Sequence, residues 1–246
     1  MKKIILISSV FLLSFQQIDN KPNYSFDKGK LSFLTGNYKL AINELSQTLN
    51  IDSTFADAYF IRSSAYSHIQ NYKCALSDIK KYIQLKPLDP KGFINVSQLR
   101  RFTNVQNSSF DASHEYILPD PSRESLLLSL NDIDHSILLD SSIEEAYYLK
   151  AEFLSELCDN KFIANNDSTD NEIINLYTKV LQLDSLNYSA YFNRAQTKLF
   201  IGDTIGACVD FTKRMSKDNN CKQALEALCK ISKNENLNKR FCSGLH

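Results

Sequence analysis

Apolar residues recur every three or four positions along most of the 246-residue chain, which is the spacing of amphipathic α-helices. One stretch marks where this pattern restarts, because IDSTFADAYF at 51–60 returns as LDSSIEEAYY at 139–148 and as LDSLNYSAYF at 183–192. Each copy places an Asp-Ser pair before an Ala-Tyr pair and a further aromatic residue. The recurrence predicts an internal repeat, in which one helix ends near the Asp-Ser pair and the next helix begins near the Ala-Tyr pair.

The Ala-Tyr pair sets a register, and a unit of 34 residues fits it. Three units fit without gaps, and the two units between them carry 20 and 10 additional residues. The turns agree with this division, because Gly follows the first helix in TGNY at 35–38 and in IGDT at 201–204. We expect units at 22–55, 56–89, 90–143, 144–187 and 188–221, with loop expansions at about 104–119 and 159–169.

Side-chain size is sorted by position within the unit. Position 8 is always small: Gly29, Ser63, Ser97, Ala151 and Ala195. Position 20 is small in four of five units: Ala41, Ala75, Ser129, Ile173 and Ala207. Position 24 is always large and apolar: Leu45, Ile79, Ile133, Tyr177 and Phe211. This sorting predicts a pair of antiparallel helices that cross closely at positions 8 and 20 and bury position 24 in a core.

The unit resembles the tetratricopeptide repeat (TPR), and the second unit matches that family's signature at Tyr59, Ser63, Tyr66, Ala75, Ile79, Tyr82 and Pro87. The resemblance implies an all-α superhelical solenoid of about five antiparallel helix pairs over residues 22–221. The fifth unit departs from the pattern near its end, as a terminal repeat is expected to do. Residues 222–246 carry apolar side chains at helical spacing, and we expect them to form a C-terminal helical cap.

By the same resemblance, the first helix of each unit lines a concave groove that binds a peptide or a helix of a partner protein. The candidate groove residues are Phe26, Asp57, Phe60, Ser64, His68, Asn95, Gln98, Arg101, Tyr148, Glu152, Phe192 and Asn193. Position 5 is apolar in every unit, which suits an apolar seam with polar flanks. The alternative is that the position-5 side chains pack only against the next repeat.

Some members of the family hold a C-terminal carboxylate with Lys and Asn side chains in their first unit. The equivalent places here are Phe26 and Lys30. Because that clamp is not reproduced, binding of chaperone tails is not predicted.

The two expansions lie between the first and second helices of adjacent units, so we expect both to emerge at one edge of the stack. Long loops in compact domains are often functional. The hypothesis is a second contact surface made by Phe110, His114, Tyr116 and Phe162. The alternative is a loop decoration without a role.

Residues 1–19 differ from the rest of the chain in composition. A basic MKK precedes the apolar run IILISSVFLLSF, which is too short to span a bilayer but suits a secretory signal peptide. We predict a signal peptide over 1–19, cleaved between Ser14 and Asn20, and export to the periplasm or the cell exterior. No Cys lies near the cut, which argues against a lipoprotein. The alternative is a buried N-terminal helix.

The six Cys residues lack metal-ligand spacing, and four of them follow residue 207. GAC at 206–208 and RFC at 240–242 resemble a Cys pair found near the end of many bacterial TPR proteins, which implies a Cys208–Cys242 disulfide. Cys221 and Cys229 are rival partners. Buried reduced thiols are the alternative to any disulfide.

Composition and motifs narrow the function. Lys plus Arg equals Asp plus Glu, at 28 each, so the chain lacks the basic surface of a nucleic-acid-binding protein. No catalytic or nucleotide-binding motif is present, and the acidic-imidazole cluster of Asp111, His114 and Glu115 lies in a polar loop. We predict a non-enzymatic adaptor of the bacterial cell envelope that binds another protein, with no metal, no cofactor and no membrane span after signal removal. The alternatives are a helical nutrient carrier and an envelope enzyme on a helical scaffold.

Overall fold

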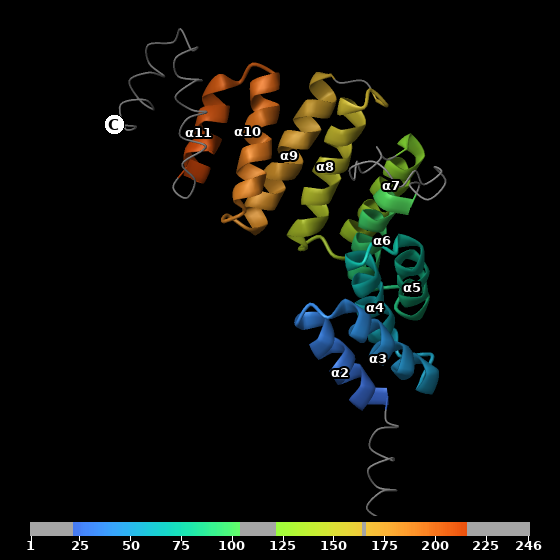
Figure 1. Cartoon of the computed structure of the whole chain (residues 1–246). Helices are drawn as coiled ribbons and strands as arrows, with labels where there is room; N and C mark the ends of the chain where they lie inside the picture. Colours follow the sequence, from blue (N-terminus) through green and yellow to red (C-terminus); the bar gives the residue numbers. More distant parts are fainter. Residues whose placement is uncertain (1–21, 104–121, 164–165, 216–246) are drawn as a thin grey trace, which may run out of the picture. The chain divides into compact units, whose positions relative to one another are not determined.

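A computed structural model describes residues 22–103, 122–163 and 166–215 of the chain (Figure 1). Within these ranges the chain forms ten α-helices and no β-strand. The chain divides into two compact units, Met1–Leu139 and Asp140–His246, and each is described by itself. The all-α fold of packed helix pairs predicted from the sequence is confirmed.

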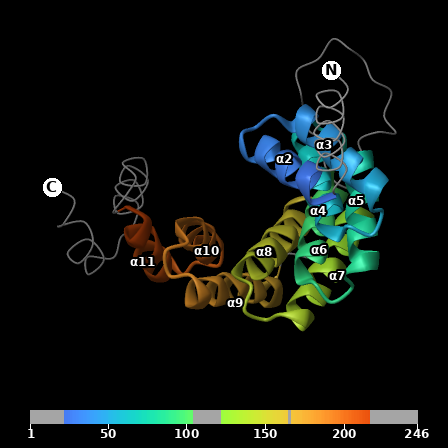
Figure 2. The same ribbon diagram turned by 90° about the horizontal axis from the view of Figure 1, so that it is seen from below.

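The first compact unit contains three helix pairs. In each pair the second helix packs against the first, and α3 and α5 also pack against the first helix of the next pair (Figures 1 and 2). The helices in chain order are α2 (Pro22–Leu34), α3 (Tyr38–Ile51), α4 (Ala56–His68), α5 (Tyr72–Leu85), α6 (Pro90–Thr103) and α7 (Arg123–Leu139).

The second compact unit contains two described helix pairs with the same packing order. Its helices are α8 (Glu144–Asp159), α9 (Asp167–Leu183), α10 (Tyr188–Phe200) and α11 (Thr204–Met215). None of the helices in the described part of the chain is long and apolar enough to cross a membrane.

The turn inside a pair depends on a left-handed residue followed by a capping side chain. Gly36 has φ +77° and Gly202 has φ +84°, a conformation that costs glycine little. Gln70 occupies the same repeat position with φ 62°, so the second repeat makes this turn without glycine. Asn37 and Asn71 then cap the second helices by accepting backbone hydrogen bonds. The predicted turn positions are therefore the observed ones.

The recurring ten-residue stretch is the joint between repeats. The Asp52 carboxylate accepts hydrogen bonds from the Thr54 hydroxyl and amide, at 2.7 and 2.8 Å, which together lower the pKa of Asp52. The Tyr59 hydroxyl closes the turn by donating to the Ser53 carbonyl oxygen at 3.3 Å. The second copy repeats all three contacts, with Asp140, Ser142, Tyr147 and Ser141. In the third copy the Asp184 carboxylate accepts from the Leu186 amide at 2.9 Å, so the Asp side chain serves the same role in all three turns.

The helix crossings lie where the size pattern placed them. The Ser63 hydroxyl at position 8 donates to the Ala75 carbonyl oxygen at position 20, at 2.9 Å. In the third repeat the direction is reversed, and Ser129 donates to the Ser97 carbonyl oxygen at 2.9 Å. A Cβ on Gly29 would come within 2.7 Å of Leu45 Cγ, so the first crossing leaves no room for a methyl group. Position 24 is buried in all five repeats.

The second expanded connection is shorter than predicted, and the first is not tested. The first lies between Thr103 and Arg123, and residues 104–119 are outside the described residues. In the second, α8 runs for 16 residues and α9 for 17, so part of the added length prolongs the helices. Asn166 accepts hydrogen bonds from the Ser168 and Thr169 amides, which starts α9 earlier than the predicted loop end at 169. Residues 1–19 and 222–246 lie outside the described residues.

Candidate partner-binding face

The predicted groove residues all lie on the first helices of their pairs. We use the name first-helix face for repeat positions 2, 5, 6, 9, 12 and 13 on these helices. In the first compact unit the predicted residues on it are Phe26, Asp57, Phe60, Ser64, His68, Asn95, Gln98 and Arg101. In the second compact unit they are Tyr148, Glu152, Phe192 and Asn193.

Three of the four aromatic side chains at position 5 pack against a ring on the second helix of their own repeat, whereas Phe26 packs against Phe55 at the start of α4. The ring centroids of Phe60 and Tyr82 are 5.0 Å apart, and those of Phe192 and Phe211 are 5.7 Å apart. Phe60 and Phe192 remain only half-buried, so each keeps part of its surface exposed. Ile94, in contrast, is 5% exposed and belongs to the core. Ile94 is therefore too buried to contact a partner, whereas Phe60 and Phe192 keep exposed surface.

In the second compact unit, three predicted residues come together. The Asn193 amide nitrogen on α10 donates to the Tyr148 hydroxyl on α8 at 3.1 Å. Burial raises the pKa of the Tyr148 hydroxyl, and the neighbouring Glu152 carboxylate raises it further. The Tyr148 ring packs edge-on against Tyr177 of α9, which is 2% exposed. Tyr148, Glu152 and Asn193 therefore form a cluster of an aromatic ring, a carboxylate and an amide, and this cluster packs on the buried ring of Tyr177.

In the first compact unit, the predicted residues are more dispersed. Asp57 is paired with Lys86 at 2.6 Å, and both side chains are largely exposed. The His68 ring is stacked on Tyr38 with centroids 4.2 Å apart and planes 3° apart, so one face of the imidazole is already covered. Tyr72 and Phe102 stack in the same way between the next two repeats, at 4.8 Å. These stacks join neighbouring repeats at the turn side of the helices.

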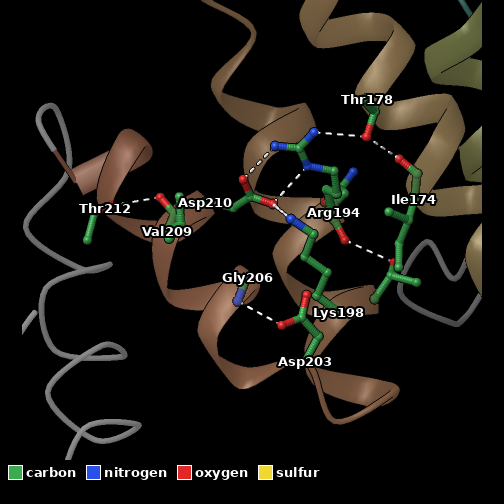
Figure 3. Close-up of polar contacts among 11 residues, drawn as sticks. Ile174, Thr178, Arg194, Lys198, Asp203, Gly206, Val209, Asp210 and Thr212 are labelled. Atoms are coloured by element: carbon green, nitrogen blue, oxygen red, sulfur yellow. Dashed lines mark hydrogen bonds and ion pairs between the residues drawn. The ribbon is translucent and has the colours of Figure 1, made fainter. Parts of the chain in front are cut away.

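A network of polar contacts joins the helices of the fifth repeat, and its residues were not among the predicted site residues. The Arg194 guanidinium on α10 donates twice to Asp210 on α11, at 2.6 and 2.8 Å, and once to the Thr178 hydroxyl on α9, at 2.9 Å (Figure 3). Lys198 reaches the same Asp210 carboxylate at 2.9 Å. Because Asp210 has a side chain only 2% exposed, these contacts tie three helices together from inside.

The same bridge recurs in the first compact unit. Arg62 on α4 donates to both carboxylate oxygens of Asp78, at 2.7 and 2.8 Å, and to the Ser46 hydroxyl of the preceding repeat at 2.9 Å. Burial alone lowers the pKa of Arg62, but the Asp78 contacts outweigh it and the net direction is upward. The bridge links positions 7 and 23 of one repeat to a hydroxyl at position 25 of the repeat before it. Comparing these positions between repeats two and five is the one sequence signal that reveals it.

The remaining predicted contacts are tested only in part by the structure. Phe110, His114, Tyr116 and Cys242 lie outside the described residues. Phe162 follows α8, is half-buried, and donates its amide to the Leu157 carbonyl oxygen at 2.9 Å.

Cys208 is buried, and burial raises the pKa of its thiol. Cys74, Cys158 and Cys208 form no disulfide with one another in the described ranges. The Cys208–Cys242 pairing stays a prediction. Residues 22–103, 122–163 and 166–215 hold no group of three or more His, Cys, Asp or Glu side chains that could bind a metal ion.

No protein-family model matches the chain. Hsp70-Hsp90 organizing protein 2 of Arabidopsis thaliana is 30% identical over 105 residues, which are 43% of this chain and 18% of that protein. The heat shock protein sti1 homolog of Schizosaccharomyces pombe is 27% identical over 145 residues, which are 58% of this chain and 24% of that protein. The chain therefore matches less than a quarter of the length of either relative.

Solved structures with the same fold cover more of the chain. Yeast Tom70 superposes with a TM-score of 0.61 and 15% identity, over 85% of this chain and 40% of that one. MamA from Desulfovibrio magneticus RS-1 gives 0.60 and 14%, over 80% and 97%. YrrB, described as a TPR protein with an unusual peptide-binding site, gives 0.57 and 16%, over 88% and 96%. The tetratricopeptide-repeat fold expected from the sequence is confirmed.

Proposed function

We propose that this tetratricopeptide-repeat protein is a non-enzymatic adaptor whose first-helix face binds a peptide or a helix of another protein. The observation that carries the proposal is the state of the position-5 aromatic side chains. Phe60, Tyr148 and Phe192 are each fixed by a ring of the second helix and each keep an exposed part. Aromatic anchors held in this way lose little conformational freedom when a partner covers them.

The internal bridges support the same reading. Arg62 with Asp78, and Arg194 with Asp210, hold the first helix of a repeat against the second and against the repeat before it. The polar groups of these four side chains contact other helices of the repeats. The adjoining first-helix positions are therefore available for a partner on a support that is already rigid.

The relatives point in the same direction. One is named as an organizing protein for two chaperones, and YrrB is described as having a peptide-binding site. The first name describes an organizing role toward other proteins, and the second describes a peptide-binding site. For this chain, binding of a protein segment is a proposal, because the sequence match covers a minor part of the relatives and the structural match establishes the fold.

The adaptor proposal predicts that truncating two exposed anchors weakens partner recovery. The double variant Phe60→Ala/Tyr148→Ala removes one position-5 ring from each compact unit. Because buried aromatic anchors contribute about 2 kcal/mol or more to such interfaces, we expect recovery to fall at least about tenfold at limiting bait. The measurement is quantitative mass spectrometry of proteins retained from envelope extracts by the immobilised chain.

The matched control is Leu138→Ala/Leu186→Ala, which also truncates one exposed apolar side chain in each compact unit. Leu138 is 81% exposed on the second helix α7, and Leu186 is 67% exposed in the turn between α9 and α10. We expect this control to retain partners at the level of the unaltered chain. Equal recovery with all three proteins, each shown to be folded by circular dichroism, would contradict the first-helix face as the binding surface.

We also propose that the adaptor works outside the cytoplasm. The basis is the N-terminal sequence, in which a basic start precedes an apolar run that suits a signal peptide. Expression with a C-terminal tag in a bacterial host, followed by fractionation and N-terminal sequencing, tests this. We expect a processed chain in the periplasmic fraction that begins between Ser14 and Asn20. An unprocessed chain confined to the cytoplasm would remove the envelope from the proposal and leave the adaptor role standing.

A further inference from the structure

The two compact units differ in formal charge. Residues 1–139 contain 13 acidic and 15 basic side chains, a net charge of +2, whereas residues 140–246 contain 15 Asp and Glu against 13 Lys and Arg, a net charge of −2. The acidic excess is concentrated in residues 140–215, which contain twelve acidic and seven basic side chains. A balanced total for the whole chain hides this asymmetry. The acidic excess falls on the compact unit that also carries the Tyr148 cluster.

Four of the seven basic side chains in residues 140–215 contact groups of the second compact unit. Arg194 and Lys198 both contact Asp210, and Lys150 lies 3.7 Å from Glu172 on α9. The Lys179 ammonium lies over the Tyr147 ring, 5.8 Å from its centroid. Each of these contacts joins a cation to a group outside the first-helix face, namely Asp210, Glu172 or the Tyr147 ring.

The first-helix face of α8 and α10 carries carboxylates and no basic residue. Its three acidic residues are Glu145, Glu152 and Glu156, and its uncharged polar residues include Asn193 and Gln196. Glu152 is half-buried beside the half-buried Tyr148 ring, and the Tyr148 hydroxyl is its neighbour there. A carboxylate next to a partly exposed aromatic ring is the combination that accommodates an ammonium or guanidinium group with its alkyl stem.

We propose that this face of the second compact unit selects a partner segment that carries Lys or Arg, with its cation on Glu152 and its stem against Tyr148. The proposal rests on the proposed function and specifies the chemistry of the bound segment. It also implies rejection of acidic segments, because a carboxylate brought beside Glu152 adds like-charge repulsion to the cost of desolvation.

The test uses two fluorescein-labelled peptides of equal length, one in which Lys alternates with Leu and one in which every Lys is replaced by Glu. Fluorescence anisotropy measures their binding to the full chain at low and physiological salt. We expect the Lys peptide to bind, the Glu peptide to bind at least about tenfold more weakly, and the difference to shrink as salt rises.

Two variants with the same charge change locate the site. Glu152→Gln removes a carboxylate from the first-helix face, and Glu172→Gln removes one from α9, where the side chain is 52% exposed and paired with Lys150. We expect Glu152→Gln to weaken the Lys peptide about five- to tenfold and Glu172→Gln to leave its affinity unchanged. Circular dichroism melting of both variants shows that the fold is intact.

The outcomes separate this proposal from the broader one. Equal binding of both peptides with loss in Phe60→Ala/Tyr148→Ala would overturn the charge selection while keeping the adaptor role. Equal loss in Glu152→Gln and Glu172→Gln would reduce the effect to net charge and overturn the site. Concentration-dependent self-association that disappears in Glu152→Gln would assign the face to a second copy of this chain and also overturn it. Absence of binding by any peptide or envelope protein would count against the adaptor role itself.

Discussion

Replacing Arg62 by Met is expected to destabilise the first compact unit by about 3 kcal/mol, because it leaves the Asp78 carboxylate buried without a cation. The Asp78 side chain is 8% exposed, and both of its oxygens accept hydrogen bonds from Arg62. Met retains much of the apolar stem of Arg, so the loss reports on the charge and the hydrogen bonds rather than on packing.

The equivalent change at Arg194 is expected to cost roughly half as much, about 1–2 kcal/mol. Asp210 is as deeply buried, with a side chain 2% exposed, but it keeps Lys198 at 2.9 Å after Arg194 is lost. The two repeats differ here at position 11, which is Lys198 in the fifth repeat and Tyr66 in the second. The smaller cost expected at Arg194 than at Arg62 therefore follows from one additional cation, Lys198.

Urea denaturation followed by circular dichroism measures both effects, with separate fits when the two compact units unfold in separate transitions. The double variant Arg194→Met/Lys198→Met provides the control, because it removes every cation that contacts Asp210. We expect its cost to rise to about 3 kcal/mol, the level of Arg62→Met. A cost for Arg62→Met no greater than that for Arg194→Met alone would show that the carboxylate, once unpaired, is reached by water.

The sequence signals these bridges only through a recurrence, and it does not predict their geometry, for a physical reason. The pairing of Arg62 with Asp78 depends on how far two helices separate and on which rotamers their packing allows. Neither quantity is encoded in the spacing of the two residues. The recurrence of Arg and Asp at positions 7 and 23 in repeats two and five shows that the pair belongs to the framework. Only the structure shows that Ser46 and Thr178 extend it to the preceding repeat.

The helix crossings, in contrast, followed directly from residue size. Two helices approach closely only where both side chains are small, so positions 8 and 20 had to coincide in space once the register was known. The contact between Ser63 and the Ala75 carbonyl oxygen is the direct result. The joint between repeats was equally readable, because Asp52 and Tyr59 satisfy a turn through contacts within seven residues. Local geometry makes such features visible in the sequence.

The candidate site was predicted from the sequence better than the bridges and less completely than the helix crossings. Register placed Tyr148, Glu152 and Asn193 on one face, and the structure joins Tyr148 to Asn193 across two first helices. The same register placed His68 on that face, but its ring is stacked on Tyr38 of the preceding repeat. A position in the repeat determines the side of the helix. The identity of the neighbouring aromatic residue decides how much of the side chain is left for a partner.

Exchanging the small and large side chains at positions 75 and 79 of α5 is expected to lower the free energy of unfolding more than any conservative change in the same core. The double variant Ala75→Ile/Ile79→Ala keeps the composition and the hydrophobicity of the chain but places the large side chain at the crossing and the small one in the core. Ala75 and Ile79 are both completely buried, in a cluster with Tyr82 and Val96.

Both substitutions in this exchange are expected to destabilise the first compact unit, and their costs add. Truncating Ile79 leaves a cavity that costs about 2–5 kcal/mol, because the surrounding side chains collapse only in part. Enlarging Ala75 forces α4 and α5 apart at the Ser63 contact, which costs a further 1–3 kcal/mol or so. Since a domain of this kind is stable by only about 5–15 kcal/mol, we expect the first compact unit to be largely unfolded or strongly destabilised at 25 °C.

The control is Ile79→Leu, which conserves volume at the same site and is expected to cost less than about 1.5 kcal/mol. Urea titration and amide hydrogen exchange of α4 and α5 distinguish the two variants. A double exchange no more costly than Ile79→Leu would mean that the crossing tolerates a large side chain. The sorting of small and large residues over five repeats would then need a cause other than packing, and the size pattern would lose its value as a predictor of helix contacts.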